Sequence, residues 1–136
     1  MPEVPLSQDP GPVQEAWNEA ARADAIAEFG VLTVVQIDVL HGRGTAARWL
    51  RQQRVFSVPG PDGAQLPAFQ FVQGKPRAMI AHTMRALDGQ LTTWEILLWF
   101  TGSSGALDGQ RPVDLLTASA KEVVVAAAYQ ASLSHD

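Results

Sequence analysis

One stretch, residues 94–116, constrains the fold of this chain more than any other, because it contains an apolar helix, a glycine-rich turn and a second helix start. Thr92 and Glu95 form the capping-box pattern T-x-x-E, which predicts a helix beginning one residue after the threonine. The helix is apolar on most sides, so we expect it to be buried, and Gly102 should end it. Pro112 suits the first position of the next helix, where an N–H is not needed. The stretch therefore predicts two apolar helices placed against each other.

Length and composition limit the classes of protein to which this chain can belong. A chain of 136 residues with 46% hydrophobic residues predicts one compact domain, with room for a small second lobe. There is no cysteine, so disulfides and thiol chemistry are excluded. No apolar run approaches the ~20 residues of a membrane span, and the acidic, proline-rich start does not resemble a signal peptide. We therefore expect a cytoplasmic protein with no membrane partner.

The net charge of −4 hides an uneven distribution of charge along the chain. Residues 1–38 carry seven acids and one base, a balance of −6, whereas residues 39–61 carry four arginines and no acid. A solvated surface usually mixes its charges, so this separation favours a local anionic partner for the arginines.

The N-terminal half is expected to be helical after a disordered arm. Four prolines disfavour regular structure in residues 1–12, and residues 13–29 form an alanine-rich helix that Gly30 ends. Thr33 is a plausible N-cap for a second short helix, although its β-branched residues would also permit a strand. After two glycines, Thr45 is expected to cap a third helix that ends near residue 54.

Two short helices separated by a glycine turn have the layout of a helix-turn-helix, and the second of them carries the arginines. One interpretation is a DNA-recognition helix. Its candidate DNA-binding residues are Arg43, Thr45, Arg48, Arg51 and Arg54. The other interpretation is a solvated face that pairs with the acidic first helix, and the low isoelectric point of about 5.2 argues against strong non-specific affinity for DNA.

A short β-hairpin or wing is predicted at residues 55–69, followed by a helix that Pro76 opens. Ser119 and Glu122 form a second capping box, which announces a last helix to about Leu133. This helix is apolar on all sides. We expect one face to pack on the helix at 94–100 and the opposite face to be open to a partner.

The sequence does not suggest an enzyme. His41, His82 and His135 are isolated, and the common hydrolase, phosphate-loop and zinc-protease motifs are absent. Asp108 and Asp114 could be an acid–base pair, but a turn and a first helical turn explain them better. We therefore expect neither a cofactor nor a metal site.

The second half of the chain resembles a known family. Trp99 and Phe100, the run L-D-G-Q-R-P-V-D-L-L at 107–116 and an alanine- and valine-rich last helix are similar to the toxin-binding domain of Xre/MbcA/ParS-like antitoxins. Those antitoxins pair with RES-domain toxins, which consume NAD⁺. The resemblance covers roughly residues 67–133.

The resemblance implies a mainly α fold, with a helix-turn-helix-like part and wing at 13–66 and a toxin-binding part at 67–136. It implies an antitoxin that neutralises a RES-like toxin with its last helix, represses its own operon at operator DNA, and forms a homodimer or hetero-oligomer. The residues that would face the toxin are Lys121, Glu122, Tyr129, Gln130, Leu133, His135 and Asp136. A stand-alone DNA-binding regulator, or an adaptor that docks to another protein without a toxin, remains the alternative.

Overall fold

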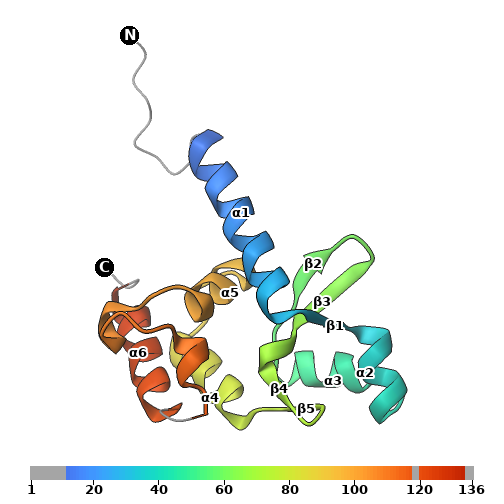
Figure 1. Ribbon diagram of the computed structural model, residues 1–136. Helices are drawn as coiled ribbons and strands as arrows, with labels where there is room; N and C mark the ends of the chain where they lie inside the picture. The colour runs from blue at the N-terminus through green and yellow to red at the C-terminus, as the bar shows by residue number, and fades with distance from the viewer. Residues whose placement is uncertain (1–11, 118–119, 134–136) are drawn as a thin grey trace.

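The computed structural model describes residues 12–117 and 120–133, and over these residues the chain is mainly helical with a small β part (Figure 1). This confirms the predicted fold class. The α-helices are α1 Pro12–Phe29, α2 Val34–His41, α3 Thr45–Arg51, α4 Ala78–Leu87, α5 Thr93–Thr101 and α6 Ala120–Leu133. Three 3₁₀ turns join them: η1 Ala68–Gln70, η2 Gly105–Leu107 and η3 Pro112–Leu115. None of the described helices combines the length and apolar character that a bilayer crossing requires.

The β part contains two small antiparallel sheets. In the first, β3 (Gly63–Pro67) lies between β1 (Val31–Thr33) and β2 (Val58–Gly60). The hairpin predicted at 55–69 is therefore present as β2 and β3. β1 was not predicted, because a three-residue strand directly after Gly30 is too short to show periodicity.

The second sheet corrects the expected start of the helix that follows. β4 (Phe71–Val72) and β5 (Lys75–Pro76) pair across a two-residue turn in which Gln73 and Gly74 both have positive φ. Pro76 therefore ends a strand, and the prediction that it opens a helix is wrong. α4 begins two residues later, with Arg77 as its N-cap.

α2 and α3 form a small lobe with the β part. Thr33 and Gln36 make a reciprocal capping box at the start of α2, which confirms the helix predicted there. The apolar core of this lobe consists of Ile37, Ala46, Trp49, Val55, Leu66 and Phe71.

α3 begins differently from the prediction. Its N-cap is Gly44, and the carboxylate of Asp38 on α2 accepts hydrogen bonds from the backbone N–H groups of Gly44 (3.1 Å) and Ala46 (3.0 Å). The prediction that Thr45 caps this helix is wrong, since its hydroxyl donates backwards to the carbonyl of Gly42. α3 also ends at Arg51 rather than near residue 54.

The larger core lies between α1, α4, α5, α6 and the turns η2 and η3. α6 packs chiefly on α4, and α5 packs chiefly on α1. We expected the last helix to pack on α5. This expectation is wrong, because the main partner of α6 is α4. The predicted arm at 1–12 and the capping box at Ser119 fall mostly outside the described residues.

Candidate functional site

α6 has one buried face and one exposed apolar face. Val123, Ala127 and Ala131 lie against the core. Val125, Tyr129 and Leu133 repeat at four-residue intervals and are 69%, 57% and 51% exposed. Residues four apart share one face of a helix, so these three form a stripe that continues the line of Lys121.

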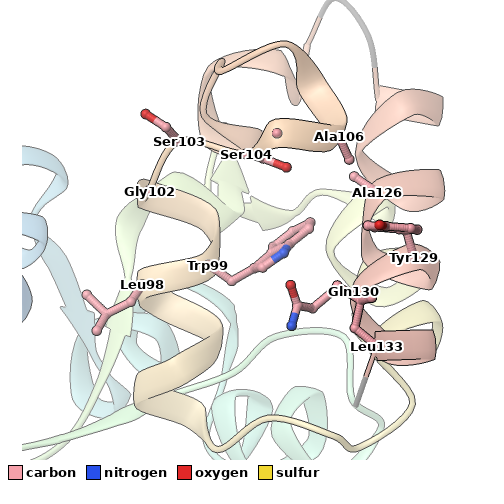
Figure 2. Close-up of a pocket in the computed structure, with 11 residues that line it drawn as sticks. Leu98, Trp99, Gly102, Ser103, Ser104, Ala106, Ala126, Tyr129, Gln130 and Leu133 are labelled. Atoms are coloured by element: carbon pink, nitrogen blue, oxygen red, sulfur yellow. The ribbon is translucent and has the colours of Figure 1, made fainter. Parts of the chain in front are cut away.

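A hollow of about 520 Å³ lies beside this stripe, between α5, the turn at 102–106 and α6 (Figure 2). Figure 2 shows the Trp99 side chain extending from α5 into the hollow toward α6, with the Gln130 side chain of α6 beside it. Tyr129 and Leu133 line its α6 side, and among the residues that the structure describes those that line it are uncharged. This end of the site therefore suits an uncharged group.

A second hollow of about 470 Å³ lies on the other side of Tyr129, lined by Asp108, Lys121, Glu122 and Val125. The two hollows share the lining residues Ala106, Ala126 and Tyr129. We call the two together the α6 groove, in which Tyr129 lines both the neutral end and the charged end.

The wall of the groove opposite α6 is a closed turn. The N–H of Ser104 donates to the carbonyl of Gln110 (3.0 Å), and the N–H of Gly109 donates to the carbonyl of Ser104 (2.8 Å). Asp108 has φ +57° in this turn and ends η2. Its conformation supports the expectation that Asp108 closes a turn.

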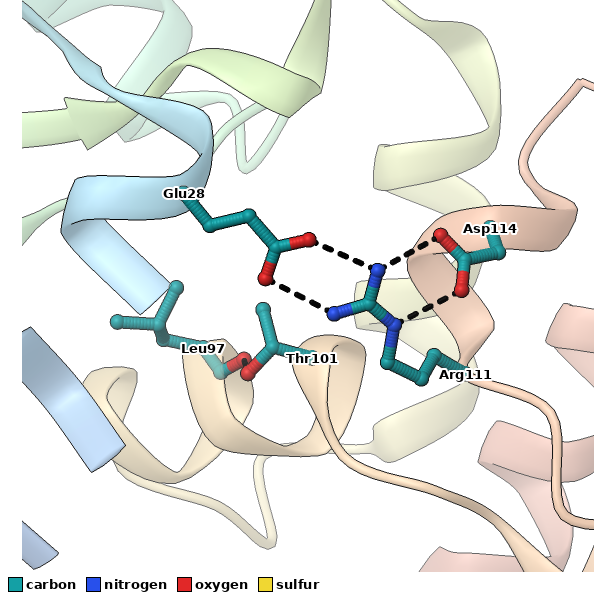
Figure 3. Close-up of polar contacts among 5 residues, drawn as sticks. All are labelled: Glu28, Leu97, Thr101, Arg111 and Asp114. Carbon is teal, nitrogen blue, oxygen red and sulfur yellow. Dashed lines mark hydrogen bonds and ion pairs between the residues drawn. The ribbon is translucent and has the colours of Figure 1, made fainter. Parts of the chain in front are cut away.

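Arg111 holds the next corner of the chain against α1 (Figure 3). Its two terminal nitrogens donate to the carboxylate of Glu28 at 2.9 Å each, and it also donates to both carboxylate oxygens of Asp114 at 2.8 and 3.0 Å. These bonds lower the pKa of both carboxyl groups and raise the pKa of Arg111. Asp114 is thus bound to an arginine rather than to Asp108.

The candidate DNA-binding residues are only partly placed to contact a ligand. The side chains of Arg43, Arg48 and Arg51 are exposed, and Arg54 is exposed with its guanidinium 5.6 Å from the ring centre of Trp49. We call these four arginines the basic surface. Thr45 is 3% exposed and its hydroxyl is already hydrogen-bonded, so its assignment as a DNA contact is corrected.

The structure brings five of the seven predicted toxin-facing residues to one groove: Lys121, Glu122, Tyr129, Gln130 and Leu133. His135 and Asp136 lie outside the described residues. Sequence reasoning missed the groove residues of α5 and the turn, Leu98, Trp99 and Ala106, and also missed Val125. Of these, only Val125 had a sequence signal, because it lies four residues from both Lys121 and Tyr129.

The part of the chain that the structure describes contains no cluster of metal-binding side chains. Within 12–117 and 120–133, no three His, Asp or Glu side chains form a group that could hold a metal ion. His82 is exposed and contacts Arg85 on the same helix, at 2.7 Å.

Comparisons with family models, with curated proteins and with solved structures found no match for this chain.

Proposed function

We propose that this chain is the antitoxin of a type II toxin–antitoxin pair, a non-enzymatic protein that binds and neutralises a RES-like, NAD-consuming toxin through the α6 groove. The observation that carries the proposal is that five residues assigned to the toxin by resemblance line a single exposed groove.

The physical character of the groove supports a protein ligand. Binding energy in protein interfaces concentrates in a few aromatic and aliphatic anchors that become fully desolvated, surrounded by polar residues that orient the partner. Tyr129 has the position of such an anchor, since it lines both hollows and is more than half exposed. Lys121 and Glu122 supply charges of opposite sign at one end, which favour one orientation of the partner.

The experiment is co-expression with the product of the adjacent gene, with complex formation and cellular NAD⁺ as the two readouts. The wild-type chain should form a complex and preserve NAD⁺. Tyr129→Asp should weaken the complex at least about tenfold, because a charge would be buried in the interface centre. Val72→Asp is the matched control, since Val72 is an exposed apolar residue of β4.

Two outcomes would contradict the proposal. One is a complex that forms and protects NAD⁺ equally well with Tyr129→Asp. The other is a neighbouring gene product that neither binds this chain nor lowers NAD⁺.

A second candidate function, a DNA-binding regulator that acts alone or represses the operon, is favoured by the basic surface beside the α2–turn–α3 unit. Arg48→Ala combined with Arg51→Ala should reduce operator binding and lower its salt dependence by about two counterion equivalents. Toxin neutralisation should be unchanged in this variant. DNA affinity that the double variant does not alter would remove this candidate.

A further inference from the structure

A pocket that the proposed function does not use lies between α1, the N-terminal half of α5 and α6. Its volume is about 550 Å³, which is within the range of small-molecule sites. Two tryptophans line it, Trp94 and Trp99, together with one cation, Arg22, and one anion, Glu95. We call it the α1–α5 pocket.

Arg22 is the polar centre of this pocket. It lies four residues after Asn18, so both side chains are on the face of α1 that lines the pocket. Its guanidinium carbon is 4.8 Å from the centre of the Trp94 ring, which is a cation–π distance. Its Nε is buried, and the N–H there has no acceptor among the residues that the structure describes. A buried donor without a partner costs free energy, so an acceptor that enters the pocket would remove this cost.

The charge of the pocket limits what can enter. Both ion pairs among the described residues involve Arg111, so Arg22 has no carboxylate partner there. Glu95 accepts a hydrogen bond from the backbone N–H of Thr92 at 2.8 Å as part of the cap of α5. One positive and one negative side chain line the pocket, and this balance favours an acceptor with a single negative charge over a polyanion such as phosphate.

The apolar walls of the pocket indicate the rest of the ligand. Trp94 and Trp99 are both partly exposed, and Leu91 and Leu98 lie beside them. Flat aromatic rings pack on indoles in offset or edge-to-face contacts. A flat ring that carries one carboxylate therefore matches both the walls and the arginine.

We propose that the α1–α5 pocket binds a small aromatic monocarboxylate. The carboxylate accepts from the guanidinium of Arg22, and the ring packs on Trp99. Because Nε is screened from solvent, the Arg22 side chain rotates slightly on the Trp94 ring to meet the ligand. This inference depends neither on a toxin nor on DNA.

The pocket adjoins the α6 groove but can be distinguished from it. Leu98, Trp99 and Gln130, which Figure 2 labels, line both the pocket and the neutral hollow of the groove. Trp94 lines the pocket and neither hollow of the groove, whereas Tyr129 lines the groove and not the pocket. The NMR signals of these two rings therefore report which of the two sites a ligand occupies.

The experiment is an NMR titration of the full chain with phenylacetate and, in parallel, with phenylacetamide, which has the same shape and no charge. Phenylacetate should bind saturably with a Kd of about 1 mM or below, as expected for a ligand of this size. Phenylacetamide should bind at least about tenfold more weakly, because it offers no charged acceptor to Arg22. The indole N–H signals of Trp94 and Trp99 should shift more than those of Trp17 and Trp49. Single replacements by phenylalanine assign the four signals.

A variant tests the arginine itself. Arg22→Gln should weaken phenylacetate binding at least about tenfold and leave the weak binding of phenylacetamide unchanged, which a general loss of structure would not do. Lys75→Gln, which removes an exposed cation of β5, is the matched control and should bind phenylacetate like the wild type. Circular dichroism checks that both variants fold, and the comparison of acid and amide on the wild type needs no variant.

Four results would overturn the proposal. The wild type could show no saturable binding of phenylacetate up to about 10 mM. The acid and the amide could bind equally well, or Arg22→Gln could bind the acid as tightly as the wild type does. Shifts of Tyr129 without shifts of Trp94 would place the probe in the α6 groove instead. Displacement of phenylacetate by an equal concentration of inorganic phosphate would make Arg22 a general anion site.

Discussion

At the scale of single residues, Arg111 connects two segments that are far apart in the sequence. Its planar guanidinium donates to two carboxylates at once, from Glu28 on α1 and from Asp114 three residues away. All three side chains are partly exposed, so solvent screens each pair, but bidentate geometry and a shared cation make the network stronger than isolated surface pairs.

This network predicts a pH dependence of stability. The pKa values of Glu28 and Asp114 lie below their usual 4.5 and 3.8, so the stabilisation is complete at neutral pH and is lost as pH falls below about 4.5. Arg111→Ala should lower Tm by about 2–4 °C at neutral pH and flatten the fall of Tm with acidification. Thermal unfolding at several pH values measures both effects. Lys75→Ala, which removes an exposed cation of β5, is the control. Parallel pH profiles for Arg111→Ala and wild type would contradict the prediction.

At the scale of elements, the sequence predicted the start of a helix correctly where the capping side chain belongs to the first turn of that helix. The predicted N-cap Thr33 and the predicted capping box at Thr92 are both present, and each makes reciprocal hydrogen bonds. The start of α3 could not be predicted in this way, because its backbone N–H groups are satisfied by Asp38, six and eight residues earlier. Nothing in the sequence pattern indicates that α2 would turn this carboxylate toward α3.

The cap supplied by Asp38 leads to a second prediction. Asp38→Ala should expose the first turn of α3, lowering Tm by about 2–4 °C and accelerating hydrogen exchange at the amides of Gly44 and Ala46. Asp38→Asn keeps one carbonyl acceptor and should have a smaller effect. Unchanged exchange at both amides in Asp38→Ala would contradict the role of this side chain.

The sequence predicted only one wall of the candidate groove, the wall formed by α6. The residues on α6 could be named from the sequence because they repeat along one helix. The opposite wall, with Leu98 and Trp99, depends on how α5 and the turn after it are placed beside α6, and this placement is set by contacts with α1 and α4. Such contacts connect distant parts of the chain and leave no local pattern.

At the scale of the whole molecule, two apolar cores meet at one buried polar side chain, Gln70. Its side chain accepts from the N–H of Phe56 (2.7 Å) and donates to the carbonyls of Phe56 (2.9 Å) and Pro67 (3.1 Å). Phe56 stacks on Phe100 in the larger core, whereas its neighbour Val55 belongs to the smaller core. A glutamine is ordinarily exposed, so the sequence gives no sign of this position.

Gln70 gives a third prediction. Gln70→Leu should lower the free energy of unfolding by roughly 2–4 kcal/mol, because the buried backbone groups of Phe56 would lose their partner. Urea denaturation measures the loss, and Gln52→Leu, an exposed glutamine, should change stability by less than about 0.5 kcal/mol. Equal effects of the two substitutions would show that Gln70 does not join the cores in the way described.

Tyr129, which lines both hollows of the α6 groove, is also the single tyrosine of the sequence. Every aromatic proton signal of tyrosine type in an NMR spectrum of this chain therefore comes from the centre of the groove, without isotope editing or mutagenesis. A ligand that contacts this ring from either hollow should shift those signals. The molecule thus carries a built-in spectroscopic probe at the place where the proposed ligand binds.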